Sequence, residues 1–338
     1  MTSFTSIAAF EAALAHLGEP DAGAAADARV RQAELTKPAG SLGRLEEIAT
    51  FFAGWQGRAR PRIARARAAI FAGNHGVAVH GVSAFPPGVT AQMVANFANG
   101  GAAINALSEA AGLELAVVAL DLDRPTADFT AAAAMSADEC LDALNRGAAA
   151  VDADLDLLVL GEMGIGNSTA AAALCARSFA GGVAGWVGPG TGVDGHGVAR
   201  KIAVIEQALA FHRDAPRTAF ETLRRVGGRE IAALAGAILR ARQLRVPVLL
   251  DGFICTAAIA PLAAENPAIV DHCIAGHCSA EPGHRRLLAL LGLDPLLSLD
   301  MRLGEGSGAA VAAHIIRSAL AAHDGMATFA EAAVSGSL

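Results

Sequence analysis

The stretch LDLLVLGEMGIGNSTAAAALCARSF, residues 155–179, decides which fold the sequence predicts. It opens with a short apolar run, continues through a glycine-rich turn and ends in an alanine-rich run of helical composition. A buried strand that leads through a glycine turn into a helix is the repeating unit of parallel sheets. The stretch therefore predicts one strand–helix unit of an α/β protein.

The same unit recurs along the chain. Four further apolar runs, each leading through a connecting segment into a helical pattern, are AAIFAG (68–73), LELAVVALDLD (113–123), VPVLLDG (246–252) and HCIAGH (272–277). Their alternation with helices predicts a Rossmann-like α/β fold, with a parallel sheet of about six strands wrapped by helices.

Both ends of the chain have helical patterns and no strand pattern. Residues 1–66 contain three helical stretches separated by Pro and Gly breaks, and residues 310–338 are again alanine-rich. We expect the two ends to form one small helical domain, with 1–66 as its N-terminal part and 310–338 completing it. Residues 67–309 would then form the α/β catalytic domain, because ligands of parallel sheets bind beyond the strand ends.

The composition favours a globular protein that binds small molecules. Of 338 residues 53% are apolar, and the net charge of -7 is spread without long runs, so neither a nucleic-acid partner nor a membrane partner is expected. Five cysteines lie mostly in apolar runs and predict reduced thiols in a cytoplasmic protein. The N-terminal segment lacks a signal-peptide pattern, and no apolar run reaches the roughly 18 residues of a membrane span.

Lysine is unusually scarce in this sequence. Of the 26 basic residues only Lys37 and Lys201 are lysines. A coding preference for arginine explains the count equally well, but lysine is also the compact point charge that suits a phosphate oxygen. Lys201 therefore becomes a candidate phosphate ligand.

Two glycine loops precede helices. Residues 164–169 (GIGNST) follow the strand of the opening stretch, and residues 188–194 (GPGTGVD) lead into the helix that carries Lys201. Backbone N–H groups at such helix starts bind anions. The first loop lacks the third glycine and the acidic residue of a dinucleotide fingerprint, and neither loop is a P-loop. Each loop alone is compatible with a plain turn, but together with Lys201 they predict a phosphate cradle.

The residues that hydrolases and metal-dependent enzymes require are not found in the expected patterns. Neither a serine-hydrolase nor a cysteine-hydrolase motif is present, and the spacing of His272, Cys273, His277 and Cys278 does not suit zinc. The pair Asp121 and Asp123 is a weak match to a magnesium–pyrophosphate site. We therefore expect neither a metal nor a cofactor.

Two carboxylates remain, each framed by glycines: Glu162 in GEMG and Glu305 in LGEGSG. A carboxyl group that is partly removed from water has a raised pKa, which suits a general base for a heteroaromatic N–H. The alternative for each is a structural carboxylate that accepts hydrogen bonds from loop N–H groups.

Eight blocks of sequence stand in the order found in one enzyme family: KPAGSLGRLE (37–46), FAGNHGVAVHGVSAFPPGVTAQMVANFANGGAAIN (71–105), GEMGIGNSTAAAAL (161–174), GPGTGVD (188–194), GGREIAALAGAIL (227–239), PVLLDGFICTAA (247–258), GHCSAEPGHRRLL (276–288) and MRLGEGSGAA (301–310). Together they closely resemble the nicotinate-nucleotide:dimethylbenzimidazole phosphoribosyltransferases of cobalamin lower-ligand synthesis. The resemblance spans nearly the whole chain.

This resemblance implies transfer of 5-phosphoribosyl from nicotinate mononucleotide to 5,6-dimethylbenzimidazole, with α-ribazole 5′-phosphate and nicotinate as products, in a homodimer. It assigns the catalytic base to Glu305, a hold on the acceptor base to Glu162 and the nucleotide phosphate to Lys201. The implied acceptor slot contains Ser83, Gln92, Met163 and Leu303, and the implied phosphate cradle contains Gly166, Asn167, Ser168, Gly190 and Thr191. Because the chain has no Tyr, Phe85 is a candidate wall of the slot.

Two positions depart from the family pattern. Asn74 stands where aspartate is common, which leaves the roles of Asn74 and its neighbour His75 open, and Ser168 replaces a threonine but keeps the hydroxyl. Two alternatives also stay open. The acceptor could be adenine, a phenolic compound or another benzimidazole, or the chain could be a non-catalytic nucleotide-binding protein, against which the intact Glu305, Glu162 and Lys201 argue.

Overall fold

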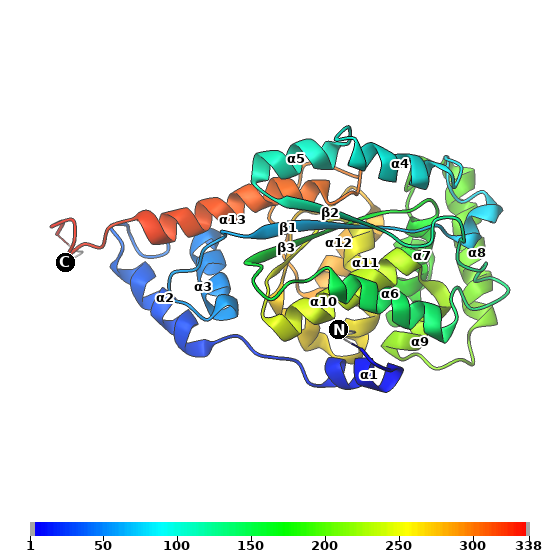
Figure 1. Cartoon of the computed structure of the whole chain (residues 1–338), viewed down its shortest axis with the longest axis horizontal. Helices are drawn as coiled ribbons and strands as arrows, with labels where there is room; N and C mark the ends of the chain where they lie inside the picture. Colours follow the sequence, from blue (N-terminus) through cyan, green and yellow to red (C-terminus); the bar gives the residue numbers. More distant parts are fainter. Residues whose placement is uncertain (1–3, 336–338) are drawn as a thin grey trace.

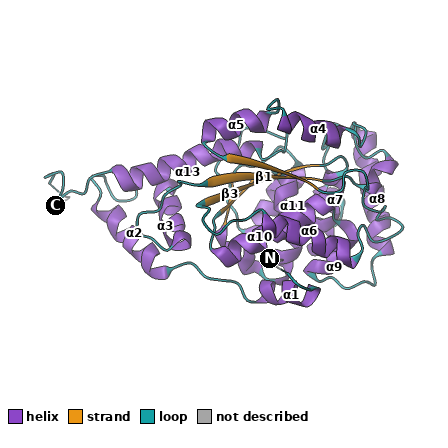
Figure 2. Cartoon of the chain, in the orientation of Figure 1, coloured by secondary structure: helices purple, strands orange, loops and turns teal. Residues whose placement is uncertain are grey.

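The computed structural model describes residues 4–335, and its centre is a parallel β-sheet covered by helices on both faces (Figure 1 and Figure 2). The strands lie in the order β2-β1-β3-β4-β5, and every neighbouring pair is parallel. Their bounds are β1 (Ala66–Ala72), β2 (Glu114–Ala119), β3 (Leu157–Met163), β4 (Val248–Leu250) and β5 (Cys273–Ala275). The predicted α/β fold class is confirmed.

The sheet has five strands where about six were expected. Each of the five coincides with one of the apolar runs found in the sequence. After β5 the described residues form two isolated bridges, a parallel one between His277 and Leu297 and an antiparallel one between Leu35 and Thr328, and each is too short to count as a strand. The strand count from the sequence was therefore one too high.

Alternating strand residues face two separate cores, as the two-residue period of a strand requires. Phe71, Leu158 and Leu250 point to one face, which is covered by the helices α6 (Ala137–Ala149), α7 (Asn167–Ser178), α9 (Ala219–Val226), α10 (Arg229–Leu244) and α11 (Phe253–Glu265). Ile70 and Val159 point to the other face, which is covered by α3 (Arg44–Gln56), α5 (Ala103–Ala111) and α13 (Ser307–Gly325).

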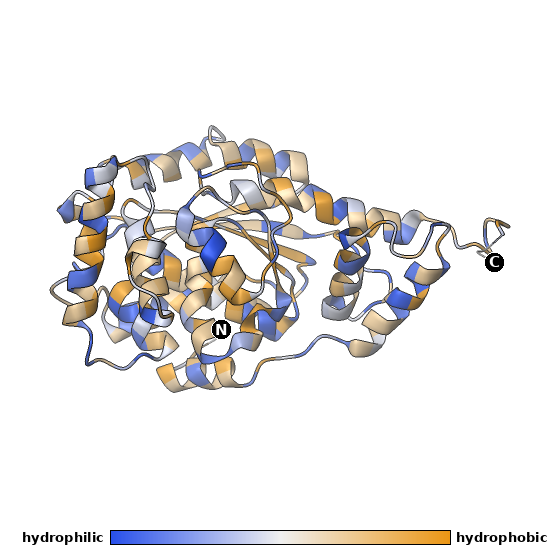
Figure 3. Ribbon diagram, turned by 180° about the vertical axis from the view of Figure 1, so that it is seen from behind, coloured by the Kyte–Doolittle hydropathy of each residue, from blue (hydrophilic) through white to orange (hydrophobic). Residues whose placement is uncertain are grey.

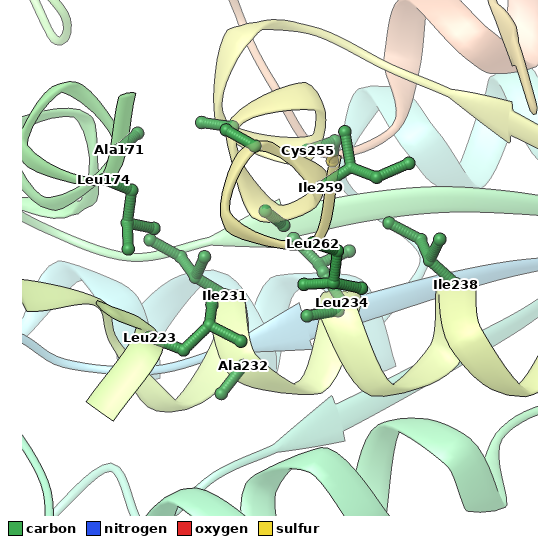
Figure 4. Close-up of a cluster of buried hydrophobic side chains, with 14 of the residues drawn as sticks. Ala171, Leu174, Leu223, Ile231, Ala232, Leu234, Ile238, Cys255, Ile259 and Leu262 are labelled. Carbon is green, nitrogen blue, oxygen red and sulfur yellow. The ribbon is translucent and has the colours of Figure 1, made fainter. Parts of the chain in front are cut away.

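The first of these cores is built largely from helix–helix contacts. Figure 4 shows Leu174 of α7, Leu223 of α9, Ile231 of α10 and Ile259 of α11 converging. In Figure 3 the hydrophobic residues likewise concentrate toward the sheet, at the centre of the large body that the sheet and its covering helices form. Burial of this apolar surface is the main force that fixes the sheet and, with it, the strand ends.

The helices at the two ends of the chain lie in different places. α1 (Ile7–Ala15) packs against α9 in the large body, whereas α2 (Ala22–Glu34) packs on α3, and α3 on α13. α13 starts at the sheet and extends outward to this helical group (Figure 1). Arg31 of α2 connects this helix to the end of α13 by donating hydrogen bonds to the carbonyls of His323, Asp324 and Met326. The domain boundaries at 66/67 and 309/310 stay a prediction.

The remaining helices surround the strand ends. They are α4 (Val89–Ala98), α8 (Gly195–Phe211) and α12 (Pro282–Leu291), with the short 3-10 turns η1 (Gly76–His80), η2 (Ala184–Trp186) and η3 (Pro267–His272). Among the described helices none combines the length and apolarity that a membrane crossing needs.

Candidate active site

A pocket of about 660 Å³ opens at the carboxyl ends of the strands. Its wall includes the end of β3 and the loops that precede α7, α12 and α13, which is where parallel sheets place ligands. Lining residues come from every predicted part of the site, among them Glu162, Ser168, Gly190 and Glu305. Residues from distant parts of the sequence therefore meet in one cavity.

Glu305 occupies a sharply bent loop at this pocket. Gly304, Glu305 and Gly306 all have positive φ angles, of 84°, 62° and 78°. Glutamate rarely adopts this left-handed conformation, so the surrounding structure must hold it there at an energetic cost. The backbone N–H of Glu305 donates to the carbonyl of Glu162, at 3.2 Å, and that of Gly306 donates to the Asp251 carboxylate, at 3.1 Å.

The absence of a side chain at Gly161 permits this arrangement. A Cβ atom at Gly161 would lie 2.5 Å from the nitrogen of Gly306 and 2.7 Å from the carbonyl carbon of Glu305. A Cβ at Gly304 would lie 2.7 Å from Oε1 of Glu162. The glycines around the two glutamates therefore let the end of β3 and the Glu305 loop approach each other closely.

Both glutamates are removed from water. Glu162 and Glu305 are each 5% exposed, and Oε2 of Glu305 is buried without a hydrogen-bond partner among the described residues. Glu162, in contrast, accepts a hydrogen bond from the side-chain amide of Asn167. Glu305 lines the pocket, and its carboxylate accepts no hydrogen bond from the described residues, so the group is free to accept one from a ligand N–H.

The surroundings favour the protonated form of these carboxyl groups. Burial, and then the charges of Glu230 and Asp251, raise the pKa of Glu162 to about 8. Burial, and then the charge of Asp251, also raise the pKa of Glu305 above its usual 4.5. With a pKa of about 8, Glu162 carries a proton at neutral pH, which leaves Glu305 as the better proton acceptor.

Two buried histidine–carboxylate pairs, which the sequence did not reveal, lie next to the chain segments that carry the two glutamates. His75 and Glu230, 1% and 0% exposed, form a hydrogen-bonded pair next to Gly73 and Gly164. Asp251 accepts the N–H groups of Gly306 and Ala309 at the start of α13, and His277 lies 3.4 Å from it. The open role of His75 thus includes holding Glu230 in place.

The other end of the pocket is formed by the glycine loops, with Lys201 buried behind Ser168. Lys201 is 1% exposed, and its Nζ donates to the hydroxyl of Ser168, at 3.0 Å, and to the carbonyl of Gly188, at 3.1 Å. Burial lowers the pKa of Lys201, an effect that the charge of Glu281 opposes. Lys201 does not line the pocket itself but lies directly beneath Ser168, which does.

The predicted acceptor slot is mainly apolar. Met163, Leu303 and Phe85 line the pocket, and Phe85 and Leu303 are 52% and 58% exposed at its mouth. Ser83 lies beside the pocket and contacts Thr191 through their hydroxyls, at 3.1 Å. Gln92 is exposed and is not among the lining residues.

The predicted phosphate residues divide into two groups. Ser168, Gly190 and Thr191 line the pocket as expected. Asn167 also lines it, but its amide is engaged by Glu162, and Gly166, with φ of 96°, shapes the start of α7 without lining the pocket. The structure thus brings the loop residues together, but the side chain of Asn167 is bonded to Glu162 and does not point to the predicted phosphate residues.

Several lining residues were absent from the prediction. They are Val89, Met93, Gly164, Ile165, Gly252, Phe253, Ile254, His277, Ser279, Glu281, Arg302 and Gly304. Met93 and Arg302 are the immediate neighbours of the predicted Gln92 and Leu303. A signal for Glu281 was present in the block GHCSAEPGH, since an acidic residue there follows a strand end.

Fold and pocket together define the class of the protein. It is an α/β protein whose ligand pocket, at the carboxyl edge of a parallel sheet, has a buried glutamate pair at one end and a buried lysine under a glycine loop at the other.

Comparison with known proteins narrows this class. A family model described as Phosphoribosyltransferase matches residues 17–334. The nicotinate-nucleotide–dimethylbenzimidazole phosphoribosyltransferase of Novosphingobium aromaticivorans is 72% identical over 100% of both chains, and that of Ruegeria pomeroyi is 58% identical over 99% of both. The chain therefore belongs to the nicotinate-nucleotide–dimethylbenzimidazole phosphoribosyltransferase family, which confirms the resemblance seen in the sequence.

Solved structures agree. The crystal structure of CobT from Thermus thermophilus has a TM-score of 0.87 to this chain at 41% identity, and covers 93% of this chain and 100% of that one. A second structure, of the phosphoribosyltransferase from the same organism, has the same TM-score at 39% identity and covers 94% and 100%.

Proposed function

We propose that the protein transfers 5-phosphoribosyl from nicotinate mononucleotide to 5,6-dimethylbenzimidazole and releases α-ribazole 5′-phosphate and nicotinate, in the assembly of the cobalamin nucleotide loop. The observation that carries this proposal is the Glu305 carboxylate, which is buried at the pocket with one oxygen unpartnered among the described residues and its pKa raised. It matches a base that must accept one proton from a flat heteroaromatic ring.

The donor needs little activation by the protein. Its nicotinate ring is a pyridinium, and cleavage of the bond to ribose neutralises that ring, so nicotinate leaves readily without a metal. The acceptor attacks the ribose carbon from the opposite face, which converts a β-linkage into an α-linkage through an oxocarbenium-like transition state. The principal task of the pocket is to hold two rings and a ribose in line.

Glu305 then removes the N–H proton of the benzimidazole while the other nitrogen of the benzimidazole forms the bond to ribose. Glu162, protonated at neutral pH, holds the acceptor beside it through a carboxyl group that Asn167 orients. General-base assistance of this kind contributes about 10²- to 10⁴-fold in rate. The hydrogen bonds that the N–H groups of Glu305 and Gly306 donate fix the loop that carries this base at the pocket.

At the other end, Lys201, Ser168 and the loop around Gly190 bind the 5′-phosphate. A lysine under a hydroxyl, with glycine N–H groups nearby, provides a point charge and short donors. The apolar slot of Met93, Met163 and Leu303 accepts a flat ring, and methionine adapts to rings of different outline. This adaptability favours, as a second candidate, the same reaction with another benzimidazole, adenine or a phenolic acceptor.

We further propose that the enzyme is a cytoplasmic homodimer. Its five cysteines are all free and buried, which supports a reducing compartment.

The test is incubation of the protein with nicotinate mononucleotide and a panel of acceptors, followed by mass-spectrometric identification of the ribotide. We expect the dimethylbenzimidazole ribotide to form fastest. Faster formation of another ribotide would favour the second candidate, and no ribotide with any acceptor would refute the transferase assignment.

A further inference from the structure

A third carboxylate, Glu281, lies at the phosphate end of the pocket. It is the N-cap residue of α12, yet its side chain makes no hydrogen bond to its own helix. Instead, Oε1 accepts the backbone N–H of Gly190, at 2.9 Å, from a loop 91 positions away in sequence. Glu281 is 8% exposed and lines the pocket. Its carboxylate therefore occupies an N–H group of the predicted phosphate cradle.

The loop is folded closely around this carboxylate. A Cβ atom at Gly188 would lie 2.2 Å from Oε2 of Glu281. A Cβ at Gly190 would lie 2.6 Å from the hydroxyl of Ser168 and 2.7 Å from Nζ of Lys201. Because Gly188 and Gly190 have no side chains, the carboxylate of Glu281, the hydroxyl of Ser168 and the ammonium group of Lys201 can all lie against this loop.

The charges explain why an acidic residue stands here. Lys201 is almost fully buried, and its two hydrogen-bond acceptors, the Ser168 hydroxyl and the Gly188 carbonyl, are both neutral. A buried ammonium group without a counter-charge is strongly destabilising. Glu281 supplies that counter-charge from its place against the Gly190 loop: burial lowers the pKa of Lys201, and the charge of Glu281 opposes this and so favours the protonated form. Lys201 and Arg302 in turn favour the ionised form of Glu281, against the rise in its pKa that burial causes.

A phosphate bound to this cradle competes with Glu281. The Gly190 N–H has one hydrogen and serves one acceptor, and two anions beside one lysine repel each other. Arg302 lines the same part of the pocket, is exposed and approaches the Gly190 carbonyl at 3.5 Å. Its charge favours the ionised form of Glu281 and provides a second cation beside the Gly190 loop.

We propose that Glu281 is an internal anion of the phosphate cradle, which neutralises Lys201 in the free protein and is displaced from the Gly190 N–H by the phosphate of the nucleotide. The proposal rests on the function proposed above, because it takes the cradle to be the phosphate site. Glu281 then limits the affinity for the donor and assists the departure of the phosphorylated product. It is a specificity-determining residue for the phosphate group and takes no part in the proton transfer.

The test measures phosphate binding directly, without turnover. Inorganic phosphate and nicotinate mononucleotide are titrated into wild type and Glu281→Gln by calorimetry, and the melting temperature is recorded with and without phosphate. We expect Glu281→Gln to bind both ligands about tenfold more tightly, because the competing charge is gone. Without phosphate the variant should melt at a lower temperature than wild type, and saturating phosphate should reduce the difference.

Two further variants separate the effect of the Glu281 hydrogen bond from that of its charge and from a general effect of losing a carboxylate. Glu281→Asp retains the charge but is one methylene shorter, so it frees the Gly190 N–H and should also tighten phosphate binding. Glu265→Gln is the matched control, because Glu265 likewise accepts one backbone N–H, from Ala219 at 2.7 Å, but lies outside the pocket. Its phosphate affinity should equal that of wild type.

Unchanged or weaker phosphate binding in Glu281→Gln, or in Glu281→Asp if the first variant does not fold, overturns the proposal. Weaker binding would make Glu281 a direct ligand of the donor instead. Ser168→Ala and Lys201→Ala test the cradle itself: if both retain wild-type phosphate affinity, the phosphate site of the proposed function is wrong whatever Glu281 does.

Discussion

The two ends of the pocket treat buried charge in opposite ways. At the acidic end, burial, and then the charge of the nearby Asp251, raise the pKa values of Glu162 and Glu305. At the phosphate end, the charge of Lys201 is balanced by Glu281 and by two neutral acceptors. A buried carboxyl group with a raised pKa is suited to accepting or releasing a proton, whereas a lysine beside a carboxylate is suited to binding an anion.

Under the proposed function, this difference assigns the proton transfer to one end, where Glu162 also holds the acceptor, and the binding of the nucleotide phosphate to the other. A change at the acidic end should act mainly on kcat, and a change at the phosphate end mainly on the KM of the nucleotide. The following variants test that division, beginning with the largest expected effect.

Glu305→Gln should abolish most of the turnover. It removes the proton acceptor and keeps the shape of the side chain, so we expect kcat to fall about 10²- to 10⁴-fold while both substrates still bind. Steady-state kinetics with dimethylbenzimidazole and calorimetry for each substrate measure the two effects. Glu265→Gln should behave as wild type, and a near-normal kcat in Glu305→Gln would remove Glu305 from the chemistry.

Gly161→Ala should act on the base without touching a substrate. The added methyl group would collide with the backbone of residues 305 and 306 and displace the Glu305 loop. We expect kcat to fall about 100-fold, which is typical of a misplacement near 1 Å, and the melting temperature to fall as for an overpacked core.

The control is Gly325→Ala at the end of α13, where an added Cβ meets nothing within 4 Å. If Gly161→Ala keeps the wild-type kcat, the close approach of the two chain segments does not position the base.

Lys201→Ala should raise the KM for nicotinate mononucleotide about 10- to 100-fold, the effect of losing a charged hydrogen bond worth roughly 1.5–3 kcal/mol. The KM for dimethylbenzimidazole should stay the same, because the slot lies at the other end. Kinetics with each substrate varied in turn measure both values. A variant in which only the acceptor KM rises would reverse the assignment of the two ends.

Glu162→Gln should change how stability depends on pH. The folded protein holds the Glu162 proton up to about pH 8, whereas the unfolded chain releases it near 4.5, so the wild type loses stability as the pH rises between these values. The neutral variant lacks this loss. Relative to wild type it should gain on the order of 3–4 kcal/mol of unfolding free energy from about pH 5 to about pH 8, since each pH unit in this range changes the free energy by about 1.4 kcal/mol.

Urea unfolding at the two pH values measures this gain. A constant difference between variant and wild type would show that Glu162 is ionised throughout this range.

The sequence predicted much of this division because its signals are local. The opening stretch of residues 155–179 folds into β3 and α7 with the glycine turn between them, as its pattern indicates. The scarcity of lysine pointed to Lys201, and the glycine frames pointed to Glu162 and Glu305. Each of these signals lies within a few residues of the group that it marks.

Other features could not be predicted because they depend on contacts between distant segments. Glu230 lies in a sequence with an ordinary helical pattern, and only the fold places His75 against it. Glu281 resembles a residue placed for a helix N-terminus, but its partner is Gly190. The five-strand count likewise depends on where residues after β5 run, which no local pattern records.

The central claim is that Glu305 accepts the proton of the acceptor N–H, and a series of benzimidazoles with increasingly acidic N–H groups tests it most directly. The rates of wild type and Glu305→Gln are measured with each acceptor at one pH. We expect the defect of the variant to shrink as the N–H becomes more acidic, because such an acceptor loses its proton without a base. A defect that is equally large across the whole series would contradict the claim.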